Sequence, residues 1–248
     1  MGPGLPLRGN RDDTGEWVSV TDPSPQRPFV VALDGPAASG KGTVASGLAA
    51  HYGLPYLDTG LLYRAVGVLM QRAGQGLDDE AAASAQAHML TADLLADPGF
   101  RTRAAGEAAS RVAVYPRVRE ALMEFQRTFA GQEGGAVLDG RDIGTVIAPN
   151  APAKLYVTAS PEVRAERRWK QLMGQGETVT LDAVLADIRL RDERDSGRAA
   201  APLVRADDAV LLDTSEMTID QAADAARRIV EAARVRWEAS LNDNPNAP

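Results

Sequence analysis

The feature that most constrains the fold is a glycine-rich loop placed between a predicted strand and a predicted helix. Residues 29–34 (Phe-Val-Val-Ala-Leu-Asp) form a short apolar run typical of a buried parallel strand. The loop of residues 35–43 follows, and a helical pattern runs from Lys41 to Tyr52. In such a loop, successive backbone N–H groups bind phosphate oxygens, helped by the positive end of the helix. This order predicts a nucleoside triphosphate site; the alternative is an ordinary glycine-rich turn with a surface lysine.

The loop differs at one position from the commonest phosphate-binding motif, G-x-x-x-x-G-K-[ST]. That motif places a hydroxyl directly after the lysine, where it binds Mg²⁺. Here Gly42 follows Lys41, and the hydroxyl comes one residue later, at Thr43. Lys41 still supplies a mobile positive charge between the terminal phosphates. The pattern indicates triphosphate binding and leaves the reaction open.

Four further apolar runs predict the other strands of a sheet, at residues 54–58, 135–139, 153–159 and 209–213. Helical patterns separate these runs, and such alternation favours a five-stranded parallel α/β sheet covered by helices on both faces. Several of the runs end on an aspartate: Asp34, Asp58, Asp139 and Asp213. Because open parallel sheets bind ligands beyond the carboxyl ends of their strands, we expect the site at that edge.

The helical patterns carry their own start and stop signals. Residues 107–129 read as one long helical region, which Pro116 is expected to interrupt. Ser160 should cap a helix that begins at Pro161, and another helix is expected over residues 180–197. Thr218 and Gln221 have the spacing of a capping box at the start of the last helix.

The charge balance argues against general nucleic-acid binding. The 248-residue chain has 27 basic and 34 acidic side chains and a net charge of −7, whereas nucleic-acid binding relies on a basic surface. An anionic ligand must therefore meet a local cluster of arginines. The chain has no cysteine for a disulfide or a thiolate zinc site, and its histidines, His51 and His88, lie far apart beside no ligand-like carboxylates.

The two ends of the chain differ in composition from the rest. Residues 1–27 are rich in Gly, Pro and charge and lack the apolar segment of a secretory signal, so we expect a flexible extension. Residues 242–248 are expected to form a flexible tail. No run of about 18 apolar residues suggests a membrane span, and the expected location is the cytoplasm.

A second candidate anion site follows residues 54–58. Thr59 is expected to cap a helix whose free N–H groups attract an anion, and Tyr63 and Arg64 come about one turn later. Together they could hold a second phosphate opposite the loop. The alternative is a capped amphipathic helix with Tyr63 in the core and Arg64 in solvent.

A third candidate cluster follows residues 135–139. Asp139 at a strand tip beside a phosphate loop could organise Mg²⁺ and its water. Arg141 could neutralise phosphate charge, and Asp142 could accept a hydrogen bond from an amino group. The alternative is a turn held together by an arginine–aspartate pair.

A fourth cluster has the spacing of a helix face: Arg191, Arg194, Asp195 and Arg198. An arginine face of this kind is typical of a lid that closes over a transferring phosphoryl group and excludes water. The alternative is an exposed helix carrying pairs such as Asp187–Arg191.

These stretches, together with residues 109–122 (Ala-Ser-Arg-Val-Ala-Val-Tyr-Pro-Arg-Val-Arg-Glu-Ala-Leu), resemble in content and order the bacterial-type cytidylate kinases. The "GKGT" ending of the loop also resembles the nucleoside monophosphate kinases. The resemblance runs from about Val30 to the last helix and implies a P-loop kinase fold with an acceptor-binding insert and a lid. It implies a kinase domain over 28–241, an insert at about 75–110, shorter and more helical than usual, and a lid at about 175–200.

The resemblance also implies the reaction and its residues: ATP as donor, CMP or dCMP as acceptor, and Mg²⁺. The ATP phosphates would lie against Gly35, Pro36, Ala37, Ala38, Ser39, Gly40, Lys41, Gly42 and Thr43. The acceptor phosphate would contact Thr59, Tyr63, Arg64 and Arg141, and the cytosine ring would contact Ser110, Arg119 and Asp142. The acceptor sugar would contact Arg191 and Asp195, and the phosphates would contact Arg191 and Arg198. Transfer itself would depend on Lys41, Arg141, Arg191 and Arg198.

Mg²⁺ would be held through phosphates and water and not by direct protein ligands, with Thr43 and Asp139 as the nearest candidates. No nucleic-acid or membrane partner is expected, and the expected state is a monomer. Two alternatives stay open: another small P-loop kinase acting on UMP, AMP or a metabolite, and a nucleotide sensor that binds ATP without turnover.

Overall fold

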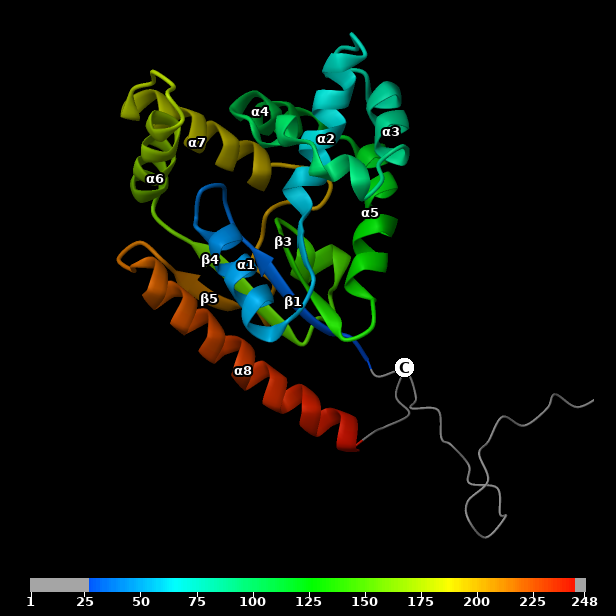
Figure 1. Ribbon diagram of the computed structural model, residues 1–248, viewed down its shortest axis with the longest axis vertical. Coiled ribbons are helices and arrows are strands. Elements are labelled where there is room, and N and C mark those ends of the chain that lie inside the picture. The colour runs from blue at the N-terminus through cyan, green and yellow to red at the C-terminus, as the bar shows by residue number, and fades with distance from the viewer. Residues whose placement is uncertain (1–26, 244–248) are drawn as a thin grey trace, which may run out of the picture.

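The computed structural model describes residues 27–243, so the predicted extension and tail lie almost entirely outside the described residues. A five-stranded parallel sheet with the order β2-β3-β1-β4-β5 forms the centre (Figure 1). Its strands are β1 (Phe29–Asp34), β2 (Tyr56–Asp58), β3 (Gly135–Gly140), β4 (Ala153–Thr158) and β5 (Val210–Asp213). All five predicted strands are present, and the predicted α/β class is confirmed.

Helices cover both faces of this sheet (Figure 1). They are α1 (Lys41–Tyr52), α2 (Thr59–Arg72), α3 (Glu80–His88), α4 (Arg103–Val112), α5 (Pro116–Ala130), α6 (Pro161–Gly174), α7 (Leu181–Ser196) and α8 (Ile219–Asp243), with short helical turns η1 (Asp93–Ala96), η2 (Pro98–Arg101) and the π-type turn η3 (Ile143–Ile147). No helix within residues 27–243 combines the length and apolar character needed to cross a bilayer.

Strand β1 shows why its sequence is apolar throughout. Val31 and Leu33 are fully buried against α1 and α8, whereas Val30 and Ala32 are buried in the core formed with α2 and α5. Both faces of the strand are therefore covered, which removes the polar alternation of a half-exposed strand.

The local signals for helix ends are mostly confirmed. The region 107–129 is divided into α4 and α5, and Pro116 is the first residue of α5. The Ser160 hydroxyl accepts a hydrogen bond from the Val163 N–H at 3.3 Å, and Thr218 and Gln221 exchange the two bonds of a capping box.

Two groups of helices stand beyond the carboxyl edge of the sheet, at the top of Figure 1. One contains α2, α3 and α4, and the other is the α6–α7 pair. The pair has a small apolar core of its own, formed by Ala165, Leu172, Val184 and Ile188. These two groups, with the loop before α1, are the elements that enclose the site.

Candidate active site

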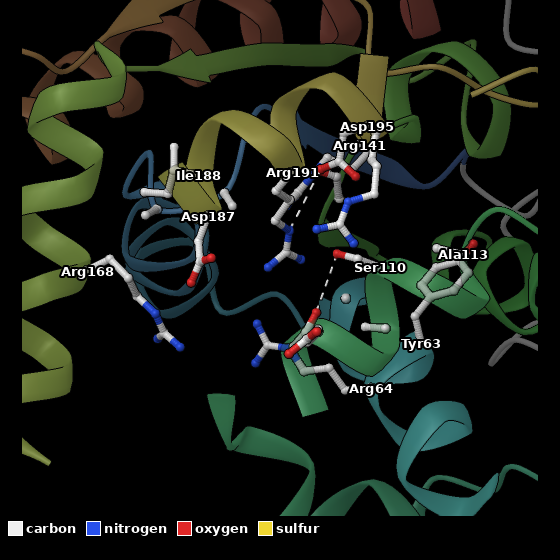
Figure 2. Close-up of a pocket in the computed structure, with 18 of the residues that line it drawn as sticks. Tyr63, Arg64, Ser110, Ala113, Arg141, Arg168, Asp187, Ile188, Arg191 and Asp195 are labelled. Atoms are coloured by element: carbon white, nitrogen blue, oxygen red, sulfur yellow. Dashed lines mark hydrogen bonds and ion pairs between the residues drawn. The ribbon is translucent and has the colours of Figure 1, made fainter. Parts of the chain in front are cut away.

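A cleft of about 430 Å³ lies at the carboxyl ends of the central strands, between the two helix groups. Its positively charged lining residues are Lys41, Arg64, Arg101, Arg103, Arg119, Arg141, Arg168, Arg191, Arg194 and Arg198. In Figure 2, the guanidinium groups of Arg64, Arg168 and Arg191 point into the same space from α2, α6 and α7. This concentration of positive charge in an acidic chain suits an anionic ligand.

The phosphate loop requires glycine at its first position. Gly35 has φ +152°, and a Cβ built there would lie 2.0 Å from the Val157 carbonyl oxygen. Gly40, the N-cap residue of α1, is in the left-handed region with φ 86°. These two residues let the backbone curl tightly against β4 before the helix begins, which is the shape that directs N–H groups toward an anion.

Lys41 lies over this loop. Its Nζ donates to the Pro36 carbonyl oxygen at 3.5 Å, and the residue is buried. Burial, reinforced by the nearby Arg141 charge, lowers the pKa of Lys41 to about 8. A bound anion would stabilise the ammonium form, so the lysine is placed to respond to a phosphate ligand.

The glycine after the lysine is explained by Asp139. A Cβ at Gly42 would lie 3.2 Å from Oδ2 of Asp139, and the Tyr56 hydroxyl donates to that same oxygen at 3.0 Å. Burial raises the pKa of Asp139, and the Lys41 charge opposes the rise. The carboxylate of Asp139 therefore lies beside Gly42, the position that a Ser or Thr occupies in the commoner motif. Thr43 is exposed and does not line the cleft.

The residues of the second candidate anion site belong to α2, although one prediction about them is wrong. Asp58, not Thr59, is the N-cap residue of α2, because β2 runs directly into the helix. The Thr59 hydroxyl donates to the Asp139 carbonyl oxygen at 2.8 Å and so joins α2 to β3. Tyr63 and Arg64 both line the cleft, and Nε of Arg64 is buried without a partner.

At one end of the cleft, a buried ion pair joins α5 to the segment after β3. Arg119 donates through Nη2 to Oδ2 of Asp142, and its guanidinium lies 5.7 Å from the centre of the Tyr63 ring. Ser110 of α4 lies in the same lining and donates to the Gly106 carbonyl oxygen at 3.5 Å. Three residues from separate segments, Ser110, Arg119 and Asp142, thus come together as polar groups at one cleft.

Asp195 of α7 organises the arginines near the cleft. It accepts from Nε of Arg141 at 2.9 Å and from Nη2 of Arg198, and Nε of Arg191 lies 4.0 Å away. Burial opposes ionisation of Asp195, but the charges of Arg141, Arg198 and Arg191 hold its pKa well below the ordinary value. Burial alone would lower the pKa of Arg141, yet Asp195 keeps it above the ordinary value. This cluster stays charged and ordered at neutral pH.

Two expectations about this cluster need correction. Arg198 does not share the helix face, because α7 ends at Ser196 and Arg198 folds back onto Asp195 from the following segment. The alternative pair Asp187–Arg191 is also wrong, since Asp187 pairs with Arg103 of α4 at 2.8 Å. Arg194 lines the cleft, with its Nε donating to the Leu190 carbonyl oxygen at 3.4 Å.

Sequence reasoning missed the arginines of α6. Arg168 lines the cleft and donates to the Gln171 side chain at 2.8 Å. Arg164 is buried; it donates to the Ala37 carbonyl oxygen at 3.3 Å and forms two bonds with Asp192 of α7, at 3.0 and 2.6 Å. It therefore links the phosphate loop to the α6–α7 pair.

The residues fit a metal ion only as a companion of the phosphates. In the part of the chain that the structure describes, no group of three or more His, Cys, Asp or Glu side chains is arranged to hold a metal. Asp58 and Asp139 line the cleft near Lys41 and offer oxygen atoms, the ligand type that Mg²⁺ and its water prefer.

The arrangement suits transfer between two anions. A phosphate loop and Lys41 approach one side of the cleft, and Arg64 and Arg141 approach the same space from α2 and from the segment directly after β3. Fixed cations around two such ligands offset their mutual repulsion, which is the main requirement of phosphoryl transfer.

Comparison with known proteins relates the chain to one family. The cytidylate kinase model matches residues 31–232. A cytidylate kinase of Caulobacter sp. (strain K31) is 71% identical over 209 residues, which are 84% of this chain and 97% of that protein. One from Xanthobacter autotrophicus is 65% identical over 206 residues, covering 83% and 99%. A solved structure of an uncharacterized protein from Eubacterium ventriosum ATCC 27560 is 15% identical, with a TM-score of 0.52 and coverage of 83% and 99%, a likeness of fold alone.

Proposed function

Since the chain belongs to the cytidylate kinase family and so phosphorylates CMP and dCMP with ATP as donor, we propose that this cleft is where the two nucleotides meet. The ATP phosphates lie in the loop of residues 35–43 under Lys41. The acceptor phosphate lies against Thr59, Tyr63, Arg64 and Arg141. The single observation that carries this assignment is that part of the loop, Ala37, Ala38 and Lys41, lines the same cleft as all four residues of the acceptor set.

The proposed chemistry is direct in-line transfer of the γ-phosphoryl group to an acceptor phosphate oxygen, without a phosphoenzyme. The acceptor oxygen is already anionic, so no strong base is required. Lys41, Arg141, Arg191 and Arg198 offset the charge of the phosphates, and positioning supplies the remaining acceleration.

The base is proposed to lie against Ser110, Arg119 and Asp142. The ion pair with Arg119 fixes the carboxylate of Asp142, which then accepts from the exocyclic amino group of cytosine. Uracil presents a carbonyl oxygen at that place, so a buried carboxylate would face another acceptor. Such a mismatch costs about 1–3 kcal/mol or more, enough to discriminate between the bases.

Mg²⁺ is proposed to arrive with ATP as part of the substrate. Asp139, with Asp58 beside it in the sheet register, would accept hydrogen bonds from metal-bound water. The metal would supply charge neutralisation between the phosphates. Arg191 and Asp195 are proposed to lie beside the acceptor sugar.

The test is an acceptor panel with the purified chain. ADP formation from ATP would be followed with CMP, dCMP, UMP, AMP or a non-nucleotide acceptor such as shikimate. We expect CMP and dCMP to give the highest kcat/KM. Faster turnover of UMP or AMP would show that the base-site assignment is wrong.

Two lysines make a matched pair for the same assay. Lys41→Ala should abolish turnover, because it removes the cation over the phosphate loop. Lys170→Ala removes an exposed lysine of α6 that pairs with Glu166 at the surface, and it should leave turnover unchanged. ATP binding without turnover in the unmodified chain would instead favour a nucleotide sensor.

A further inference from the structure

Asp34, the last residue of β1, is a buried carboxylate that does not line the cleft. Its Oδ1 accepts from the Ile143 N–H and its Oδ2 from the Gly144 N–H, each at 2.8 Å. Gly35 of the phosphate loop follows it directly. One side chain of the central strand therefore accepts two hydrogen bonds from the backbone of the segment that follows β3.

The two N–H groups held by Asp34 are the first of the turn η3. Such groups have no partner within their own turn, and the side chain of the N-cap residue usually accepts from the N–H of the second or third helical residue, here that of Gly144 or the residue after it. The N-cap residue here is Asp142, but its side chain makes no capping bond and pairs with Arg119 instead. Asp34 thus supplies the cap from a different strand and leaves the carboxylate of Asp142 available to the cleft.

We propose that Asp34 is a positioning residue for base recognition: by capping η3 in place of Asp142, it holds Asp142 and its partner Arg119 in the orientation that the acceptor base requires. Asp142 is joined directly to the anchored Ile143, so loss of this cap would let its side chain turn back toward the free Gly144 N–H. The inference rests on the proposed function, because it assigns Asp34 to the base subsite of that reaction.

The geometry also makes the cap sensitive to protonation. The charged and titratable groups around Asp34 are Arg141 and Asp142 after β3 and Lys154 and Tyr156 on β4. Burial raises the pKa of Asp34 to about 6, and the two backbone hydrogen bonds oppose this rise. A protonated carboxyl cannot accept equally through both oxygens, so the cap should weaken as the pH falls through that value.

The experiment is Asp34→Asn, which keeps the side-chain shape but turns one acceptor into an NH₂ group. Kinetics would be measured with CMP and with UMP as acceptors and with ATP varied. We expect the KM for CMP to rise, and the CMP-over-UMP preference in kcat/KM to fall, each on the order of 10-fold. The KM for ATP should change by less than about threefold.

A destabilised control separates positioning from mere folding. Val230→Ala truncates a fully buried side chain of α8, in the core on the opposite face of the sheet, and should lower Tm while leaving the acceptor KM and the preference unchanged. If Asp34→Asn behaves like this control, losing Tm or kcat only, the proposal is overturned.

A double variant tests whether Asp34 acts through Asp142. Asp34→Asn combined with Asp142→Asn should lose no more base preference than Asp142→Asn alone. A double variant whose loss of base preference equals the product of the two single-variant losses would contradict the proposal.

The KM for CMP would also be followed from pH 7 to 5 as a ratio of the Asp34→Asn variant to wild type, which cancels the titration of the acceptor phosphate. A ratio that does not change with pH would overturn the proposal. Failure of the wild-type chain to phosphorylate CMP would count instead against the proposed function.

Discussion

Replacing Gly35 by alanine should disable the phosphate loop without removing any functional group. The new Cβ would lie 2.0 Å from the Val157 carbonyl oxygen, at a backbone φ of +152° that side chains rarely adopt. Carbon and oxygen atoms approach to about 3.3 Å, so the loop must move by roughly 1.3 Å. β4 cannot yield instead, because it is hydrogen-bonded between β1 and β5.

A displacement of about 1 Å at a reacting group costs on the order of 100-fold in rate, or about 2.7 kcal/mol of transition-state stabilisation. We therefore expect kcat/KM for ATP to fall about 100-fold in Gly35→Ala. ADP formation would be measured at limiting and saturating ATP, and circular dichroism would establish that the variant is folded.

Gly47→Ala is the matched control for this substitution. Gly47 lies in α1, where an added Cβ meets no atom within 4 Å. The control should keep kcat/KM and gain about 0.5–1 kcal/mol of stability, since alanine favours helix more than glycine does. A Gly35→Ala variant within about threefold of the wild-type kcat/KM would refute the steric reasoning.

Three further outcomes are expected. Asp142→Asn should reduce the CMP-over-UMP preference about 10- to 100-fold, which kcat/KM for each acceptor measures; an unchanged preference would remove Asp142 from the base site. Asp34 has a folded-state pKa of about 6, above its ordinary 3.8, so the folded protein binds the extra proton. Its contribution to the free energy of unfolding is therefore full below pH 4 and falls by roughly 3 kcal/mol as the pH rises through 6; urea unfolding should show this component in the wild type and not in Asp34→Asn. Ser160→Ala should lower the free energy of unfolding by about 1 kcal/mol, because the Val163 N–H loses its cap; unfolding curves that coincide with the wild type would contradict this.

The fold is predictable from sequence because its signals are local. Every strand lies under helices on at least part of its length, so the central ones read as apolar runs, and the loop after β1 needs glycine at fixed places. The caps at Ser160 and Thr218 depend on residues three positions away. Such short-range rules survive in the folded protein wherever no distant residue competes with them.

The errors and omissions concern long-range partners. The Thr59 hydroxyl bonds to Asp139, 80 residues away, and this contact replaces the expected cap. Arg164 donates to Ala37 and Asp192, which are 127 and 28 residues away in the sequence. No residue near it in the sequence therefore distinguishes it from an exposed arginine. Asp34 likewise finds its partners 109 and 110 residues later.

The separate apolar core of the α6–α7 pair has a mechanical consequence. Ala165, Leu172, Val184 and Ile188 bury one another, so the two helices pack as one unit that shares no buried apolar residue with the cores on the two faces of the sheet. The rim contact between Arg103 and Asp187 is largely solvated, and pairs of that kind contribute only about 0–1 kcal/mol. Loss of that contact alone should therefore move α6 and α7 little, because the Arg164 bond to Ala37 and the buried Arg141–Asp195 ion pair also join them to the rest of the molecule.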